Sequence, residues 1–238
     1  MKPIHYIAAT TVLALASFSL ASPLAAEDAA PAAAPAAAPA AAPPAAAATP
    51  NGKVLFATKT CVACHGVNGT KPRLVYPVLA GQEAKYLLEQ MNTIADGSRV
   101  SGPDERGYPR TEGMKDVMHL ATVEEREAMA AFLTSVPAPK PVALDPPPDA
   151  ARLEAGKDAY RKGGCITCHG VDGRKPLPTY PLLAGQKRDY LKLQMTEIRD
   201  GVRKGVKLAA MMPFAKKLDE EKISLIADYL SQIERLPK

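Results

Sequence analysis

The 238-residue sequence has no tryptophan, and aromatic residues make up only 5% of it. About 85 residues with so few aromatic side chains build a thin hydrophobic core, and small domains are marginally stable by themselves. The alternation of apolar and polar positions that is typical of half-buried strands is missing, so the sequence predicts an all-α protein. Basic residues interleaved with aromatic residues are missing too, which argues against nucleic-acid binding.

Long apolar runs are missing except near the N-terminus. Lys2 precedes an apolar stretch from Ile4 to Ala21, and Leu24-Ala25-Ala26 follows as a small-residue cleavage site. This pattern predicts an export signal over residues 1–26. The apolar stretch of about 18 residues would also serve as a short membrane anchor, so an uncleaved anchor stays open. We therefore expect the chain in the periplasm, either free or tethered to the membrane.

A spacer follows the predicted signal. Residues 27–51 are mostly alanine and proline. Proline prevents a regular helix, so we expect a semi-rigid, extended segment without a core of its own.

Cysteine is rare, but every cysteine belongs to a repeated pattern. The four cysteines lie in two Cys-x-x-Cys-His motifs, at residues 61–65 and 165–169. This motif attaches c-type haem, because its two thiols add to the vinyl groups of one porphyrin and its histidine supplies an axial nitrogen. We predict two covalently bound haem c groups, each with one iron, attached to Cys61, Cys64, Cys165 and Cys168 and ligated by His65 and His169.

Two other uses of the motif fit less well. Thiol–disulfide motifs of this spacing occur near a βαβ pattern, and no strand pattern is present here. A structural zinc ion needs four ligands, whereas each motif offers three.

The second half of the sequence repeats the first with an offset of 104 residues. The match runs without a gap from Gly52/Gly156 to Arg99/Arg203, and it includes Tyr-Pro-x-Leu-Ala-Gly-Gln after each Cys motif. A proline-dense stretch separates the copies, which is typical of a linker. We predict two domains, residues 52–136 and 152–238, joined by a linker over residues 137–151.

Three main helices are predicted in each copy. They lie near residues 52–60, 82–96 and 123–135 in the first copy, and near residues 153–162, 186–200 and 219–233 in the second. Gly97 and Gly201 are expected to end the middle helices. Asp219 is expected to cap the last helix. Because the core is thin, we expect each domain to pack around its haem and to need the haem for folding.

The surroundings of the two histidines suggest how their rings are held. A ligating histidine usually donates its other ring N–H to a carbonyl oxygen. Pro77 and Pro181 follow their histidines by 12 residues and are the candidates for that carbonyl.

The sixth iron ligand decides the chemistry, because a methionine or second histidine closes the iron, whereas an open site permits peroxide or gas chemistry. In the second copy the candidates are Met211 and Met212, in an expected loop before the third helix. Met195 lies on the apolar stripe of a helix and is predicted as core.

In the first copy, Met114, Met118 and His119 all precede the third helix. Aligning the third helices gives an offset of 97 residues, which places Met114 opposite Met211. The same offset places Met118 opposite Ala215, as packing. His119 leaves bis-histidine ligation open, but we favour Met114.

The repeated motifs closely resemble those of the dihaem cytochromes c4, within the class I cytochromes c. The resemblance covers about residues 52–236, and the last of its motifs is Met-x-Pro, just before the last helix. In that family the axial methionine stands two residues before the proline, which implies Met211 before Pro213. The first copy reads Met114-Lys-Asp-Val and lacks the proline. The resemblance implies two tandem class I cytochrome c domains.

The resemblance also implies a function. It suggests a one-electron carrier between respiratory complexes that feeds a terminal oxidase, and not an enzyme. A cytochrome subunit of a dehydrogenase complex, such as a flavocytochrome c sulfide dehydrogenase, stays open. A dihaem peroxidase would need an open iron, whereas each copy offers a methionine.

Charge is distributed unevenly. Residues 52–136 carry 10 basic and 10 acidic residues, whereas residues 150–238 carry 18 and 11. A basic second copy predicts docking to an acidic surface on a membrane oxidase or dehydrogenase. The candidate contacts are Lys187, Arg188, Lys192, Arg203, Lys204 and Lys207.

Overall fold

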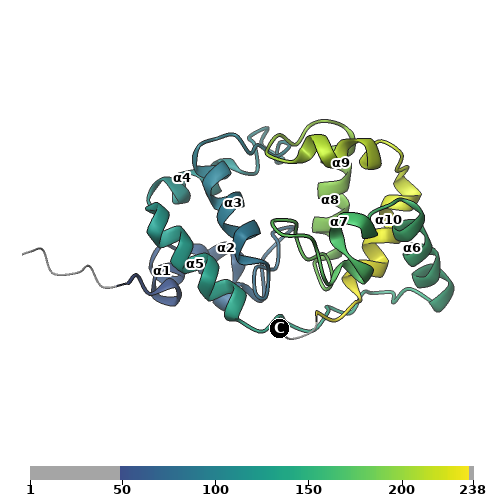
Figure 1. Ribbon diagram of the computed structural model, residues 1–238, viewed down its shortest axis with the longest axis horizontal. Coiled ribbons are helices and arrows are strands. Elements are labelled where there is room, and N and C mark those ends of the chain that lie inside the picture. Colours follow the sequence, from purple (N-terminus) through teal and green to yellow (C-terminus); the bar gives the residue numbers. More distant parts are fainter. Residues whose placement is uncertain (1–48, 236–238) are drawn as a thin grey trace, which may run out of the picture. The chain divides into compact units, whose positions relative to one another are not determined.

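The computed structural model describes residues 49–235 (Figure 1). The predicted export signal and nearly all of the Ala/Pro spacer lie outside the described residues. The described residues form helices and two isolated β-bridges, without a strand, so the all-α prediction is confirmed. None of the helices in this part of the chain is long and apolar enough to span a bilayer.

The two copies contain the same series of helices. The first copy consists of α1 (Gly52–Thr58), α2 (Cys61–His65), η1 (Val67–Gly69), α3 (Ala84–Ala95), α4 (Glu112–His119) and α5 (Val123–Ser135). The second consists of α6 (Ala150–Lys162), α7 (Ile166–His169), η2 (Val171–Gly173), α8 (Arg188–Arg199), α9 (Leu208–Ala215) and α10 (Glu220–Ser231).

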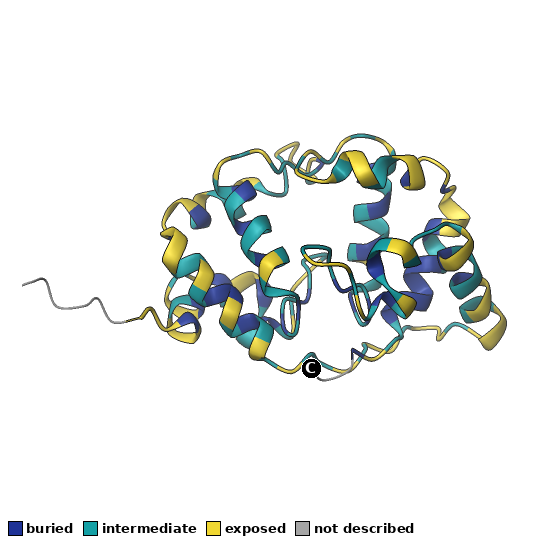
Figure 2. Ribbon diagram, in the orientation of Figure 1, coloured by how far each residue is buried: buried dark blue, intermediate teal, exposed yellow. Residues whose placement is uncertain are grey.

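The last helix organises the core of each copy. Helix α5 packs against α1 and α3, and α10 packs against α6 and α8. The buried residues lie on the helix faces that meet in these contacts (Figure 2). Gly156 allows the crossing of α6 and α10, since a β-carbon there would lie 2.2 Å from the Leu225 carbonyl oxygen. Gly52 does the same for α1 and α5 at Ala128.

The predicted helix ends are mostly confirmed. Gly97 and Gly201 follow the middle helices with φ of 77° and 69°, the left-handed conformation that glycine adopts easily. Asp219 caps α10 by accepting a hydrogen bond from the Lys222 N–H at 2.8 Å. Helix α6 begins at Ala150, inside the range expected for the linker, because the Asp149 side chain accepts from an N–H of its first turn.

One prediction about the segments before the third helices was wrong. Met211 and Met212 lie in helix α9 and not in a loop, and the first-copy candidates lie in helix α4. Leucine, alanine and methionine strongly favour helix. In α9 these residues outweigh Pro213, which lies inside the helix near its C-terminal end.

Equivalent glutamines join the two copies. The Gln82 side chain donates to the Leu182 carbonyl oxygen at 2.9 Å and accepts from the Leu182 N–H at 2.7 Å. Gln186 makes the same pair of hydrogen bonds to Val78, at 3.0 and 2.8 Å. Both glutamines are buried. Each side chain therefore pairs with the backbone of the other copy as a strand would.

Arg235 adds a third link between the copies. Its Nε donates to the Ala184 carbonyl oxygen and its Nη1 to the Ala80 carbonyl oxygen, both at 2.8 Å. These two alanines are equivalent in the repeat. Burial lowers the pKa of Arg235 to about 10.

Most of the basic residues that we expected on a docking surface are used inside the molecule. Lys187 donates to the Pro72 and Leu74 carbonyl oxygens of the first copy. Lys207 pairs with Glu89 across the interface at 2.6 Å. The remaining expected contacts, apart from Lys192, are also engaged: Arg188 pairs with Asp228, Arg203 donates to Gln90 and Gln194, and Lys204 donates to Gly201. These side chains therefore form contacts within the protein, which makes them less available to a partner protein.

Candidate haem sites

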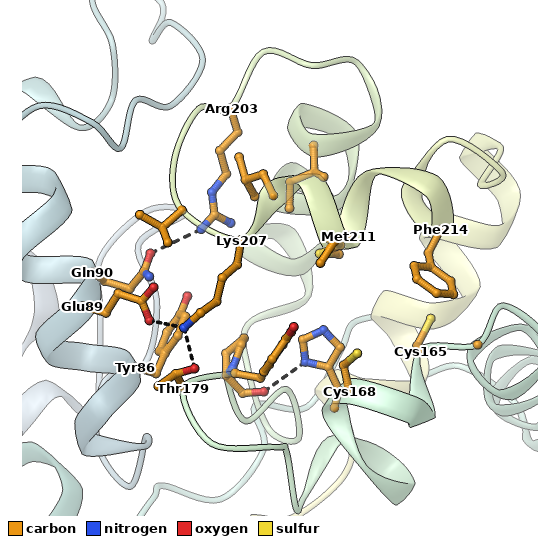
Figure 3. Close-up of a pocket in the computed structure, with 18 residues that line it drawn as sticks. Tyr86, Glu89, Gln90, Cys165, Cys168, Thr179, Arg203, Lys207, Met211 and Phe214 are labelled. Carbon is orange, nitrogen blue, oxygen red and sulfur yellow. Dashed lines mark hydrogen bonds and ion pairs between the residues drawn. The ribbon is translucent and has the colours of Figure 1, made fainter.

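An open cavity of about 760 Å³ lies beside the second Cys motif. Cys165, Cys168 and His169 line one side of it, and Met211 and Phe214 of α9 line another. In Figure 3 the side chain of Met211 extends into the space above Cys168. The remaining lining includes apolar residues of α8, of the segment before α9 and of α9 itself, namely Ile198, Val206, Leu208 and Ala210. The cavity thus presents thiols, an imidazole and a thioether to an apolar interior.

Both motif histidines are oriented by a proline carbonyl. His65 Nδ1 lies 3.3 Å from the Pro77 carbonyl oxygen, and His169 Nδ1 lies 3.2 Å from that of Pro181. Both histidines are 7% exposed. Burial lowers the pKa of each, and the proline carbonyl offsets part of this effect. Neutral imidazole is the form that binds a metal, and the contact at Nδ1 leaves Nε2 available.

The thiols do not have the properties of a redox-active pair. Burial raises the pKa of Cys165 to about 11, and burial also raises the pKa of Cys61. A reactive cysteine instead has a lowered pKa, because the thiolate is the nucleophile. Within residues 49–235 no group of three or more His, Cys, Asp or Glu side chains is arranged to hold a metal ion.

The two methionine candidates of the second copy differ in position. Met211 lines the cavity together with His169. Met212 is half-buried on the same helix but is not among the residues that line it. Phe214 reaches the backbone at the end of α6, since a β-carbon on Gly164 would lie 3.0 Å from its ring.

The candidates of the first copy also differ in burial. Met114 is half-buried and packs against the core cluster, Met118 is fully buried within that cluster, and His119 is exposed. At an offset of 97 residues, Met118 lies opposite Ala215, which is buried as well. The burial pattern of α4 and α9 is therefore consistent with the register that pairs Met114 with Met211.

Sequence reasoning missed that the first copy contributes to the second cavity. Tyr86, Glu89 and Gln90 of α3 line the cavity around Cys165 and His169 (Figure 3). These residues lie within the repeat and within the helix predicted near residues 82–96, but nothing in the sequence placed them at the other copy. Their position at the interface depends on how the copies pack together, which a repeat does not specify.

Comparison with known proteins identifies both copies. The family described as Cytochrome c matches residues 50–137, and the family described as Cytochrome C oxidase, cbb3-type, subunit III matches residues 151–230. Cytochrome c4 of Azotobacter vinelandii is 33% identical over 194 residues, which cover 77% of this chain and 87% of that protein. A protein of Thiomonas intermedia named thiosulfate dehydrogenase electron acceptor is 32% identical over 72% of this chain and 77% of its own.

A solved structure agrees with these relatives. The reduced recombinant cytochrome c4 from Pseudomonas stutzeri matches with a TM-score of 0.63 and 29% identity, over 77% of this chain and 97% of that one. Both Cys motifs, with their buried histidines, fit covalent haem, so the protein carries two haem c groups, and it transfers electrons instead of catalysing a reaction. The chain belongs to the cytochrome c4 family of dihaem c-type cytochromes.

Proposed function

We propose that this protein works in the periplasm as a carrier of single electrons between respiratory complexes, towards a terminal oxidase. The placement of Met211 beside the cavity of His169 is the observation that carries the proposal. We propose that these two residues ligate the second iron and that His65 and Met114 ligate the first. Iron closed on both sides supports electron transfer, and methionine ligation raises its reduction potential.

Replacement of the cavity methionine tests the ligand assignment. Met211→Ala is expected to open the second iron, so that the reduced protein binds one carbon monoxide per chain and the potential of that haem falls. Met212→Ala is the matched control on the same helix and is expected to leave the iron closed. Carbon monoxide binding by the Met212→Ala protein alone would contradict the assignment.

The first haem allows a parallel comparison. Met114→Ala is expected to open the first iron. Met118→Ala removes a fully buried side chain and is expected to cost about 2–5 kcal/mol of stability while the iron stays closed. Carbon monoxide titration and denaturant unfolding, measured on the same samples, separate the two effects. An opened iron in the Met118→Ala protein would assign the ligand to Met118.

For docking we propose a smaller basic surface than the one expected from the sequence. It surrounds Phe214, which is exposed beside Cys165 (Figure 3). Because Phe214 contacts Gly164, the end of α6 and the end of α9 lie next to each other. The exposed cations at these two ends are Arg161, Lys162, Lys216 and Lys217, of which Lys162 also pairs with Asp158 on the surface at 2.9 Å. An apolar contact ringed by cations suits an acidic redox partner.

The first copy lacks this surface. The equivalent positions are Ala57 and Thr58 at the end of α1, and His119 and Leu120 at the end of α4. Lys59, the nearest cation, pairs with Glu125 at 2.9 Å. These four positions are cationic in the second copy alone, and we propose that the second copy meets the acidic partner.

Charge reversal tests this docking surface. The double variant Lys216→Glu/Lys217→Glu is expected to slow electron transfer to the membrane oxidase and to weaken its salt dependence. Lys53→Glu/Lys85→Glu carries the same change of charge on exposed positions of the first copy and serves as the control. Stopped-flow rates are compared across a salt series, because charges further apart than ~10 Å are screened at 0.1 M salt. Equal rates for the two double variants would refute the surface.

The second part of the proposal concerns the electron donor. The similarity to a thiosulfate dehydrogenase electron acceptor favours a dehydrogenase as donor. A purified thiosulfate dehydrogenase with thiosulfate should then reduce both haems, which absorbance in the α-band measures. Failure of this reduction, together with stable co-purification with a flavoprotein, would instead favour the cytochrome subunit of a sulfide-oxidising complex.

A further inference from the structure

Two equivalent arginines meet at the interface between the copies. Arg99 follows α3 and Arg203 follows α8, and they are 104 residues apart. The residues after them form a backbone pair, in which the Val100 N–H donates to the Lys204 carbonyl oxygen at 3.2 Å and the Lys204 N–H donates to that of Val100 at 2.8 Å. This pair holds the two arginine-bearing segments side by side.

Each guanidinium reaches the other copy. Arg99 Nη2 lies 3.4 Å from the Tyr190 hydroxyl, and Arg203 Nη2 lies 3.4 Å from Gln90 Oε1. Arg203 Nη1 also donates to Gln194 of its own copy at 2.7 Å. All of these partners are neutral. The Nε atoms of both arginines are buried and have no hydrogen-bond partner among the described residues.

The carboxylates nearest to this pair of charges are paired with other cations. Glu89 pairs with Lys207, and Glu197 pairs with Arg110, each at 2.6 Å. Burial opposes the charge of Arg99, but Tyr190, Tyr86 and Glu197 together raise its pKa. One carboxylate oxygen of Glu197 is bound to Arg110. Burial, and then the charge of Arg99, lowers the pKa of Arg203. Two neighbouring, half-buried guanidinium groups whose nearest carboxylates are paired with other cations are unfavourable, so an anion between them would stabilise both.

The cavity beside the two arginines indicates which anion they bind. Arg99 and Arg203 line a cavity of about 1000 Å³ that is also lined by His169 and Met211. That cavity belongs to the second haem, and the only anionic groups of a haem are its propionates. We propose that Arg99 and Arg203 together bind a propionate of the second haem, so that an arginine of the first copy anchors the haem of the second. Arginine suits this role, because its planar fork of N–H donors matches a carboxylate.

Two consequences follow from this arrangement. Arg99 becomes a positioning residue for a haem that is attached to the other half of the chain. A cation near the haem also favours the reduced state, which carries one positive charge fewer. The interface then contributes to the potential of the second haem as well as to the association of the copies. This inference does not depend on the identity of the redox partners.

The test uses the full-length dihaem protein. Arg99→Leu is expected to lower the potential of the second haem, so that the ratio of reduced to oxidised iron falls about tenfold at a fixed applied potential, which is ~59 mV for one electron. The propionate bending band of the second haem in the resonance Raman spectrum is expected to shift. The first haem serves as an internal reference. Arg99→Lys keeps the charge and is expected to restore most of the potential but not the Raman band.

Arg73→Leu is the matched control, because it removes an exposed arginine of the first copy. It is expected to leave both the potential and the Raman band unchanged. If Arg99→Leu retains two haems but changes neither property of the second haem, the proposal is wrong. If Arg99→Leu fails to fold, the Raman band in Arg99→Lys decides, and an unchanged band there overturns the proposal as well.

Discussion

The reciprocal glutamines lead to a quantitative prediction about how the copies hold together. Gln82→Ala removes both hydrogen-bond partners of the buried Leu182 backbone. Each buried group left unsatisfied costs about 1–3 kcal/mol, so the variant would lose about 2–6 kcal/mol while the copies stay docked. That is a large part of the 5–15 kcal/mol that typically stabilises a folded protein. Opening of the interface is the route by which water can restore these bonds.

Amide hydrogen exchange measures this opening at single residues. A loss of about 2 kcal/mol corresponds to roughly 30-fold faster exchange of the Leu182 amide. Gln186→Ala should accelerate the Val78 amide in the same way. Acceleration of both amides in either variant would show that the interface opens as one unit.

The control for these variants is Gln232→Ala, in which the lost amide donates to Val142 within the second half of the chain. It should leave the Leu182 and Val78 amides protected. Protection at Leu182 that survives Gln82→Ala would refute the reasoning, because the glutamine would then contribute nothing to holding the copies together.

A further prediction concerns the packing within a copy. Gly156→Ala should lower the free energy of unfolding in urea by about 3 kcal/mol or more, because the new β-carbon would meet the Leu225 carbonyl oxygen. Gly113→Ala is the control: it has open space in a helix and should raise the free energy of unfolding by about 0.5–1 kcal/mol. Equal effects of the two substitutions would contradict the close crossing of α6 and α10.

Local chemistry could be predicted directly from the order of the residues. Two thiols and a histidine within five residues are sufficient to predict covalent haem, because the groups that bind it are neighbours in the sequence. The repeat at 104 residues predicted two similar domains, and the caps at Asp219 and Gly201 were visible because capping depends on residues within one helical turn. The proline carbonyl beside each histidine was likewise 12 residues away.

Positions that depend on helix packing were harder to predict. The segment of Met211 was expected as a loop, because proline and glycine in its neighbourhood suggested one, yet it forms α9. The sequence favoured Met211 and assigned Met118 to packing, and the three-dimensional arrangement adds that Met211 lines the cavity and that Met118 is fully buried in the core. Side-chain burial depends on the faces that helices present to one another, which the spacing of single residues specifies only in part.

The sequence by itself determined the covalent cofactors, the helical class and the duplication, since each is encoded within a few residues or by direct repetition. Only the tertiary structure decided how the duplicated halves use their shared residues. Arg203 and Lys207 were predicted as contacts to a partner protein, and Gln82 was known only as part of a repeated motif. Each of them makes its contact with the other copy, about 100 residues away in the chain. A repeat shows that two domains are alike, whereas packing decides which of their equal surfaces become buried.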